Sequence, residues 1–240
     1  MTSESTPPKT LETLTIPAAN GIPTASVILL HGLGGSGRDM ASLASHFQAD
    51  PALSHVQFIF PSAPTCEITA SGRARMPAWS DIYTFDFTGT EDERGMFASV
   101  AAVEAVVERA GTGAASTVLG GFSQGGGIAL LAGLTRAGGA LAGLAVLSGR
   151  LPIRDRVKAM AAPHATTIPI FYGMGTRDPR GHLIRGSVEF LGAKMGVPAA
   201  GASGSRNGLE MHTYEGMTHS ISAEEVRDLG VWLKQVLPGE

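Results

Sequence analysis

The hydrophobic positions of this chain fall into two alternating patterns. Nearly continuous apolar runs of strand length occur at residues 27–31, 56–60, 116–122, 141–149, 168–175 and 209–214. Between most of them lie stretches with an apolar residue every third or fourth position, the spacing that predicts one buried face of a helix. Apolar strands that alternate with helices are typical of a mostly parallel sheet covered by helices on both faces. The pattern therefore predicts an α/β fold.

Five helices are predicted between and after these strands. Two have a clear apolar face, formed by Met40, Leu43, Ala44 and Phe47 in the first and by Met96, Val100, Val103 and Val107 in the second. Two more are placed by their position, one from about residue 125 and one over 183–195. The last helix follows Ser222, which with Glu225 three residues later predicts a capping box. Its inward positions are Val226, Leu229 and Leu233.

Three segments follow neither pattern. Residues 1–9 are polar and contain proline, which predicts a loose lead-in, and 61–92 is predicted to be long and irregular. Residues 196–208 are rich in glycine and are predicted to form a surface loop. The length of the remainder, 10–240, suits a single α/β domain.

Composition and charge exclude several classes of function. The chain is 43% hydrophobic and 16% charged, as in a compact globular protein, and its net charge of −3 without a Lys/Arg cluster argues against nucleic acid as a partner. Cys66 is the single cysteine, so no internal disulfide can form, as expected in a reducing compartment. No apolar run approaches the roughly 20 residues that span a bilayer, and neither lipid-anchor pattern is present at the ends. We expect a cytoplasmic protein with at most peripheral membrane contact.

Two glycine-rich turns follow predicted strands, and the first suggests a nucleotide site. "HGLGGSG" at 31–37 contains Gly-x-Gly-x-x-Gly between a strand and a helix, which is the dinucleotide-binding pattern. That pattern requires an acidic residue at the end of the next strand, where this chain has Pro61 and Ser62. An NAD-linked oxidoreductase is therefore the weaker alternative.

The second turn, "GFSQGGG" at 121–127, favours acyl-transfer chemistry. Gly-x-Ser-x-Gly is a weak motif alone, but between a strand and a helix it predicts a strained elbow that exposes the Ser123 hydroxyl. The Gln124 N–H at the helix start, with the Leu33 N–H of the first turn, would form an oxyanion hole. Both glycine turns then serve one site.

A serine nucleophile needs a histidine base and an orienting acid, which in this fold follow the serine in the order acid, then histidine. Asp178 lies just past the strand that ends at 175, whereas Asp155 lies in a charged, helix-like stretch. His219 lies between the last strand and the last helix, whereas His212 lies within the strand. Asp178 and His219 are therefore the predicted partners of Ser123.

The order of "HGLG", "MPAWSDI", "GGFSQGG", "GTRDP" and "YEGMTHS" over roughly residues 22–236 resembles the acyl-protein thioesterase and carboxylesterase family of serine hydrolases, also called lysophospholipase-like. The resemblance implies an α/β-hydrolase fold without a cap domain, a Ser123, Asp178 and His219 triad, and backbone donors at Leu33 and Gln124. It further implies hydrolysis of thioesters on S-acylated proteins, or of small esters and lysophospholipids, without a metal or an organic cofactor.

The chain departs from that family around the expected acyl channel. The loop "TASGRAR" carries Arg73 and Arg75 where members that accept long acyl chains have apolar residues, and Arg180 and Gly181 replace the usual Val-Pro. If both arginines line the channel, activity should level off at medium chains. Trp79 is either a channel wall or a core residue.

We expect a thioesterase rather than a small-ester carboxylesterase. A further hypothesis is a catalytically inactive hydrolase fold that serves as a binding module. The intact set of serine, acid and histidine argues against it.

Overall fold

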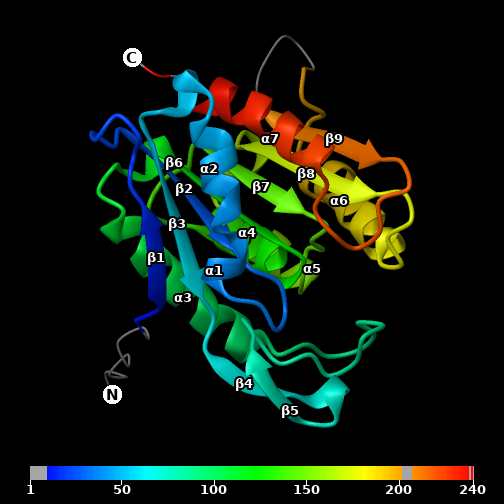
Figure 1. Cartoon of the computed structure of the whole chain (residues 1–240). Helices are drawn as coiled ribbons and strands as arrows, with labels where there is room; N and C mark the ends of the chain where they lie inside the picture. Colours follow the sequence, from blue (N-terminus) through cyan, green and yellow to red (C-terminus); the bar gives the residue numbers. More distant parts are fainter. Residues whose placement is uncertain (1–9, 202–206, 238, 240) are drawn as a thin grey trace, which may run out of the picture.

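The protein is described here by a computed structural model that covers residues 10–201, 207–237 and 239, so the predicted lead-in at 1–9 and residues 202–206 of the predicted surface loop lie outside the described residues. Its central sheet has the strand order β1-β3-β2-β6-β7-β8-β9 (Figure 1). The strands are β1 (Glu12–Ile16), β2 (Ala25–Leu30), β3 (Val56–Ser62), β6 (Thr117–Phe122), β7 (Gly143–Leu147), β8 (Pro169–Gly175) and β9 (Gly208–Tyr214).

The pairing within the sheet confirms the predicted mostly parallel architecture. β1 pairs antiparallel with β3, whereas β3, β2, β6, β7, β8 and β9 pair parallel in turn. The edge strand β1 escaped prediction because "ETLTI" is half-exposed and lacks a continuous apolar run. The carboxyl ends of the parallel strands meet at one edge, which is where α/β sheets place their ligand sites.

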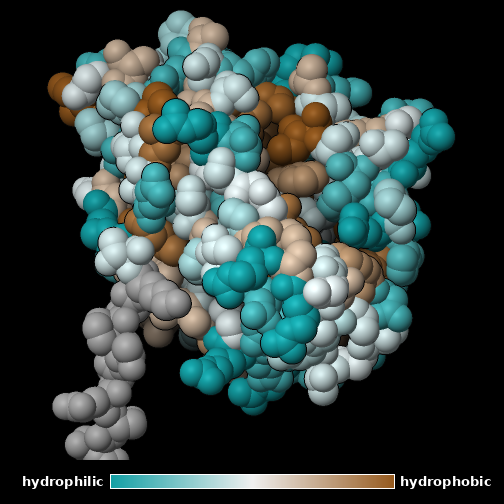
Figure 2. Space-filling model, turned by 60° about the horizontal axis from the view of Figure 1, so that its bottom comes forward, coloured by the Kyte–Doolittle hydropathy of each residue, from teal (hydrophilic) through white to brown (hydrophobic). Residues whose placement is uncertain are grey.

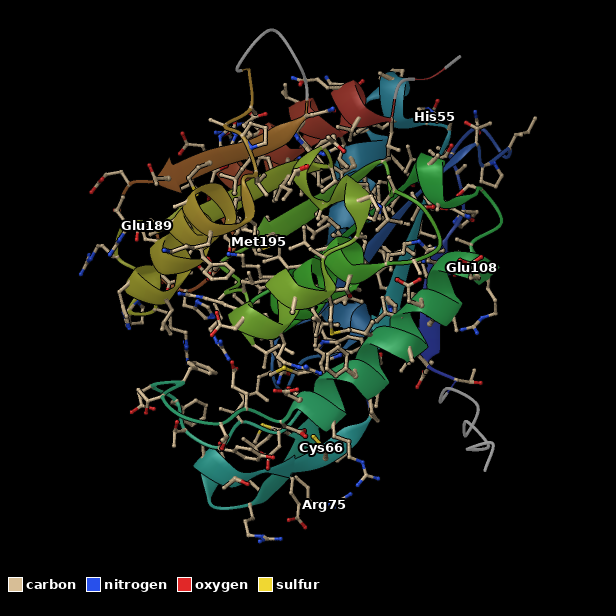
Figure 3. All side chains as sticks on the ribbon, turned by 180° about the vertical axis from the view of Figure 1, so that it is seen from behind. His55, Cys66, Arg75, Glu108, Glu189 and Met195 are labelled. Carbon is tan, nitrogen blue, oxygen red and sulfur yellow. The ribbon has the colours of Figure 1, made fainter. Side chains whose placement is uncertain are left out.

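Helices cover both faces of the sheet, as predicted (Figures 1 and 3). The buried residues of α1 (Gly37–Met40), α2 (Ser42–Gln48) and α7 (Ala223–Val236) join one core cluster, and those of α3 (Glu93–Arg109), α4 (Gln124–Thr135), α5 (Arg154–Met160) and α6 (Gly181–Met195) join the other. Short 3-10 turns occupy Pro51–Leu53, Thr69–Ser71, Ala114–Ser116 and Pro163–Thr166. No helix in the described parts of the chain is long and apolar enough to cross a bilayer.

Two predicted segments differ in the structure. The single helix expected around Met40 to Phe47 is divided at Ala41 into α1 and α2. The segment 61–92 is not irregular throughout, because it contains an antiparallel hairpin, β4 (Thr65–Ile68) and β5 (Ala74–Pro77), that projects from the body (Figure 1). Gly72 and Arg73, both with φ of 64°, form the reversal between its strands. Its apolar residues pack in a small cluster apart from the main cores, which explains the weak pattern in the sequence.

The predicted capping box at α7 is wrong in one half. The Ser222 hydroxyl accepts the Glu225 N–H at 3.1 Å, as expected. The Glu225 side chain does not return the bond: it is fully buried, and its carboxyl oxygens have no partner among the described residues. It lies against Gly173 of β8, where a side chain would collide with it. Burial raises the pKa of Glu225 to about 8.

We expect this buried carboxyl to make the free energy of unfolding fall as the pH rises from about 5 to 8. Between its ordinary pKa of 4.5 and its folded value of about 8, the folded protein holds a proton that the unfolded chain releases. The free energy of unfolding then falls by up to about 1.4 kcal/mol per pH unit. Urea unfolding across this range should therefore show a shallower slope for Glu225→Gln than for the wild type. Glu224→Gln, at the exposed neighbouring position, is the control, and equal slopes in all three proteins would contradict the assignment.

Candidate active site

Ser123 occupies a strained turn between β6 and α4. Its φ of 53° and ψ of −115° are unfavourable for a residue with a side chain. The turn is possible because β2, β6 and α4 touch through glycine: a Cβ at Gly121 would lie 2.6 Å from the Gly125 carbonyl carbon, and one at Gly125 would lie 2.6 Å from the His31 oxygen. Such distances leave no space for any side chain, so the hydroxyl of Ser123 is held above the ends of the strands.

The structure brings together the three side chains proposed from the sequence. Ser123 Oγ lies 2.8 Å from His219 Nε2, and His219 Nδ1 lies 2.8 Å from Asp178 Oδ2. The Asp178 side chain is fully buried, and its other oxygen accepts the Arg180 N–H at 2.8 Å. Because a carboxylate accepts only, Nδ1 carries the proton and Nε2 is free to accept the serine hydroxyl. The arrangement can activate a nucleophile.

The other residues considered as the acid and the base, Asp155 and His212, do not line the pocket. Asp155 is exposed at the start of α5. His212 lies within β9, stacks on Phe171 with ring centroids 4.7 Å apart, and meets Glu210 Oε1 at 2.8 Å. Their surroundings are those of a surface acid and a structural histidine.

Leu33 and Gln124, whose N–H groups are the predicted oxyanion hole, line the same pocket as Ser123. The N–H of Gln124 is in the first turn of α4 and has no helical acceptor. The N–H of Leu33 donates to no backbone or side-chain acceptor within the described residues. The turn around Leu33 is fixed by the neutral His31 ring, whose Nδ1 donates to Gly32 O at 2.7 Å and whose Nε2 accepts the Ala63 N–H at 2.9 Å. Burial lowers the pKa of His31, which favours this neutral form.

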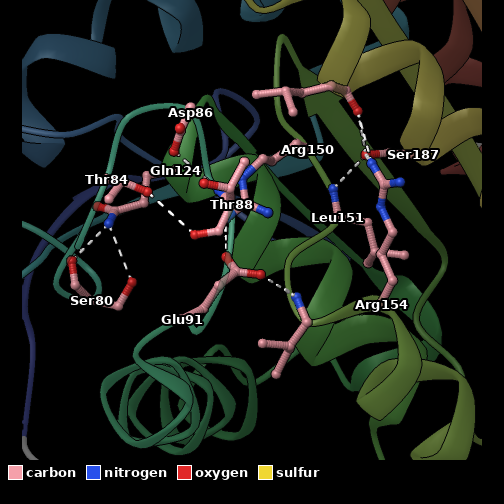
Figure 4. Close-up of polar contacts among 12 residues, drawn as sticks. Ser80, Thr84, Asp86, Thr88, Glu91, Gln124, Arg150, Leu151, Arg154 and Ser187 are labelled. Carbon is pink, nitrogen blue, oxygen red and sulfur yellow. Dashed lines mark hydrogen bonds and ion pairs between the residues drawn. The ribbon is translucent and has the colours of Figure 1, made fainter.

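Trp79 is a core residue rather than a channel wall. It is 2% exposed and does not border the pocket. Its Nε1–H donates to His31 O at 2.8 Å, and its backbone N–H donates to Gln124 Oε1 at 3.0 Å. The Gln124 amide also donates to Ser80 O at 2.8 Å. One side chain thus joins the elbow to the segment that begins the pocket wall (Figure 4).

Arg73 and Arg75 do not line the pocket, contrary to the expectation from the "TASGRAR" loop. They lie at the exposed tip of the β4–β5 hairpin, where both pair with Glu67. Their side chains are 77% and 63% exposed, and Figure 3 shows Arg75 pointing away from the body. The turn at Gly72 directs the loop into solvent, so these arginines give no basis for a limit on chain length.

The pocket wall is formed instead by residues 80–91, which belong to the segment predicted to be irregular. Aromatic and aliphatic side chains from this segment, α3, α4 and α6 line the pocket, namely Ile82, Tyr83, Phe85, Phe87, Met96, Ile128, Leu183 and Ile184. Tyr83 and Phe85 are the exposed ones, and apolar patches lie between polar ones on the face that Figure 2 shows. The aromatic residues of "IYTFDF" at 82–87, in a polar stretch, were the available signal.

An ion pair holds the C-terminal end of the 80–91 segment. Glu91 forms an ion pair with Arg150, and its Oε1 accepts the Ile153 N–H at 2.9 Å (Figure 4). The Arg150 guanidinium also lies 4.0 Å from the centre of the Phe87 ring, a cation–π distance. Gln124 at one end and Arg150 at the other therefore hold the wall over the nucleophile. In the described parts of the chain, no three His, Cys, Asp or Glu side chains converge as metal ligands would.

Known proteins resemble this chain in sequence and in fold. The phospholipase/carboxylesterase family matches residues 11–237. Acyl-protein thioesterase 1 of Mycosarcoma maydis is 35% identical over 96% of this chain and 99% of its own length, and that of Saccharomyces cerevisiae is 34% identical over 88% and 92%. Among solved structures, Arabidopsis thaliana SOBER1 covers 89% of this chain and 99% of its own, with a TM-score of 0.78 and 28% identity. Zea mays acyl-protein thioesterase 2 covers 94% and 99%, with a TM-score of 0.76 and 25% identity.

The Gln124 amide should contribute measurably to stability, apart from any chemistry. Gln124→Leu removes the amide group and leaves the buried Trp79 N–H and Ser80 carbonyl without this partner. We expect the free energy of unfolding, measured in urea, to fall by about 1–3 kcal/mol. Arg227→Leu, at an exposed position of α7, should change it by no more than about 0.5 kcal/mol. Equal effects of the two substitutions would mean that the Gln124 side-chain hydrogen bonds contribute nothing to the free energy of unfolding.

Proposed function

The chain belongs to the phospholipase/carboxylesterase family of serine hydrolases, and from that premise we propose that it is an acyl-protein thioesterase that works through an acyl-enzyme on Ser123. The observation that carries the proposal is the continuous hydrogen-bonded chain from Ser123 Oγ through His219 to Asp178, at the edge of an apolar pocket. Among the described residues, no other serine forms a hydrogen bond with a histidine.

In the first half of the reaction, His219 Nε2 accepts the Ser123 proton while Oγ attacks the carbonyl carbon of the substrate. The Leu33 and Gln124 N–H groups stabilise the oxyanion that forms. The carbon–sulfur bond then breaks, the leaving thiolate takes the proton from His219, and the acyl group stays on Ser123. Asp178 holds the imidazole in the required tautomer and stabilises its charged form.

In the second half, water attacks the acyl carbon and gives its proton to His219. The carbon–oxygen bond to Ser123 breaks, Oγ recovers the proton, and a carboxylic acid leaves. The same two N–H groups serve the second oxyanion.

The nature of the substrate is supported by the relatives and by the pocket. The relatives from Mycosarcoma maydis and Saccharomyces cerevisiae carry the name acyl-protein thioesterase, so the proposed leaving group is a cysteine thiol of an S-acylated protein. The apolar side chains of the wall suit an acyl chain, since each buried methylene contributes about 0.8 kcal/mol. The family description favours a carboxylesterase as the second candidate. Comparing kcat/KM for a thioester and an oxyester with the same acyl group separates the two.

We expect a fluorophosphonate probe to label Ser123 and no other residue, because among the described residues Ser123 alone combines the elbow with a histidine base. Ser123→Ala should abolish labelling and turnover while the melting temperature stays close to that of the wild type. Ser220→Ala, beside His219 but outside the elbow, should still be labelled. Mass spectrometry of the labelled peptide is the measurement, and a probe found on another serine would refute the nucleophile.

Asp178→Asn should lower kcat by about 10³- to 10⁴-fold, as expected when the histidine tautomer is no longer fixed. The asparagine keeps the shape of the side chain, so the fold should persist. Asp155→Asn removes the same charge from an exposed helix and should leave kcat nearly unchanged. Steady-state hydrolysis of one thioester by both variants is the measurement, and the reverse order of effects would move the acid to α5.

A further inference from the structure

The pocket contains a guanidinium that the proposed reaction does not use. Arg180 lies in the loop between β8 and α6, two residues past Asp178, and lines the same pocket as Ser123. Its backbone N–H holds Asp178 Oδ1, which fixes the position of the residue. The side chain is half-buried. The pocket that Ser123 borders therefore contains a positive charge.

The other charged side chains that line the pocket already have partners. Arg150 is paired with Glu91, and the two oxygens of Asp81 accept the Thr69 N–H at 2.7 Å and the Thr69 hydroxyl at 2.6 Å. The Arg180 guanidinium differs, because it makes no hydrogen bond or ion pair with any residue that the structure describes. It is the pocket cation left available to a ligand.

Asp178, two residues before Arg180, makes no ion pair with the Arg180 guanidinium. Asp178 is fully buried, and its two oxygens are taken by the Arg180 N–H and by His219. The first turn of α6, which begins at Gly181, contains no acidic residue, so the positive end of that helix adds to the charge of Arg180. Arg180 and the N-terminal end of α6 thus contribute positive charge to a pocket that has an apolar wall.

From these observations we propose that Arg180 binds an anionic group of the substrate, so that the enzyme prefers acyl compounds carrying a carboxylate or a phosphate over neutral ones. This rests on the proposed hydrolase function. A guanidinium matches the two oxygens of either group, and partial burial strengthens the pair relative to one in open water. The anion could stand at the far end of the acyl chain or on the leaving group, and the chemistry of recognition is the same.

Two pairs of thioester substrates distinguish these sources. In the first, pentanoyl and glutaryl groups on pantetheine differ only in the carboxylate at the end of the acyl chain. In the second, the pentanoyl group is carried by pantetheine or by 4′-phosphopantetheine, so that the leaving group gains a phosphate. For each pair the measured quantity is the ratio of kcat/KM for the anionic substrate to that for the neutral one.

We expect the wild-type ratio to be about tenfold in favour of the anion in at least one pair and to fall as salt is added. Arg180→Gln should bring that ratio to about one, and Arg180→Lys should restore part of it. Arg185→Gln is the matched control, since it removes an exposed cation of the same helix that does not line the pocket; it should retain the ratio. Whichever pair responds identifies the position of the anion.

Other outcomes overturn the proposal. Wild-type ratios near one in both pairs, or a preference that survives Arg180→Gln, would show that Arg180 does not select the substrate. In either case, Ser123-dependent hydrolysis of the neutral pentanoyl thioester would still support the proposed function. A preference lost equally in Arg185→Gln would assign it to the general potential of the helix end. Absence of any Ser123-dependent thioester hydrolysis would overturn the proposed function and this inference with it.

Discussion

The whole site depends on one close contact between backbones. β2, β6 and α4 approach each other so tightly at Gly121 and Gly125 that no Cβ fits at either position. This approach forces the turn at Ser123 into a strained conformation, which the surrounding sheet stabilises. It also brings the first turn of α4 beside the loop after β2, where Leu33 lies. Nucleophile and both candidate oxyanion donors thus follow from a single packing constraint.

The pocket wall is attached to this rigid centre rather than built into it. Residues 80–91 form no helix or strand, so their position depends on the side chains that hold their ends. Gln124 does so beside the elbow, and Arg150 does so from the loop after β7. A loop wall on a rigid centre is the usual division between scaffold and binding loops.

Polar groups in this fold are placed at some cost where α7 meets the sheet. Glu225 is buried against Gly173 without a partner in the described residues, so it is kept neutral instead of forming the capping bond that its sequence position favours. The helix start is still capped by Ser222. His219 lies in the loop between β9 and α7, three residues before the cap. The loop that carries the base therefore leads directly into the capped start of α7.

The sequence by itself determined the alternating strands and helices, the elbow at Ser123 and the order in which an acid and a histidine follow. These are local patterns, because a parallel strand is buried along its whole length and a tight turn requires glycine at fixed positions. Tertiary structure alone decided that Trp79 packs in the core, that Arg73 and Arg75 point into solvent, and that residues 80–91 line the pocket. Each of these depends on which distant segments a side chain meets, and neither hydrophobic period nor motif spacing carries that information.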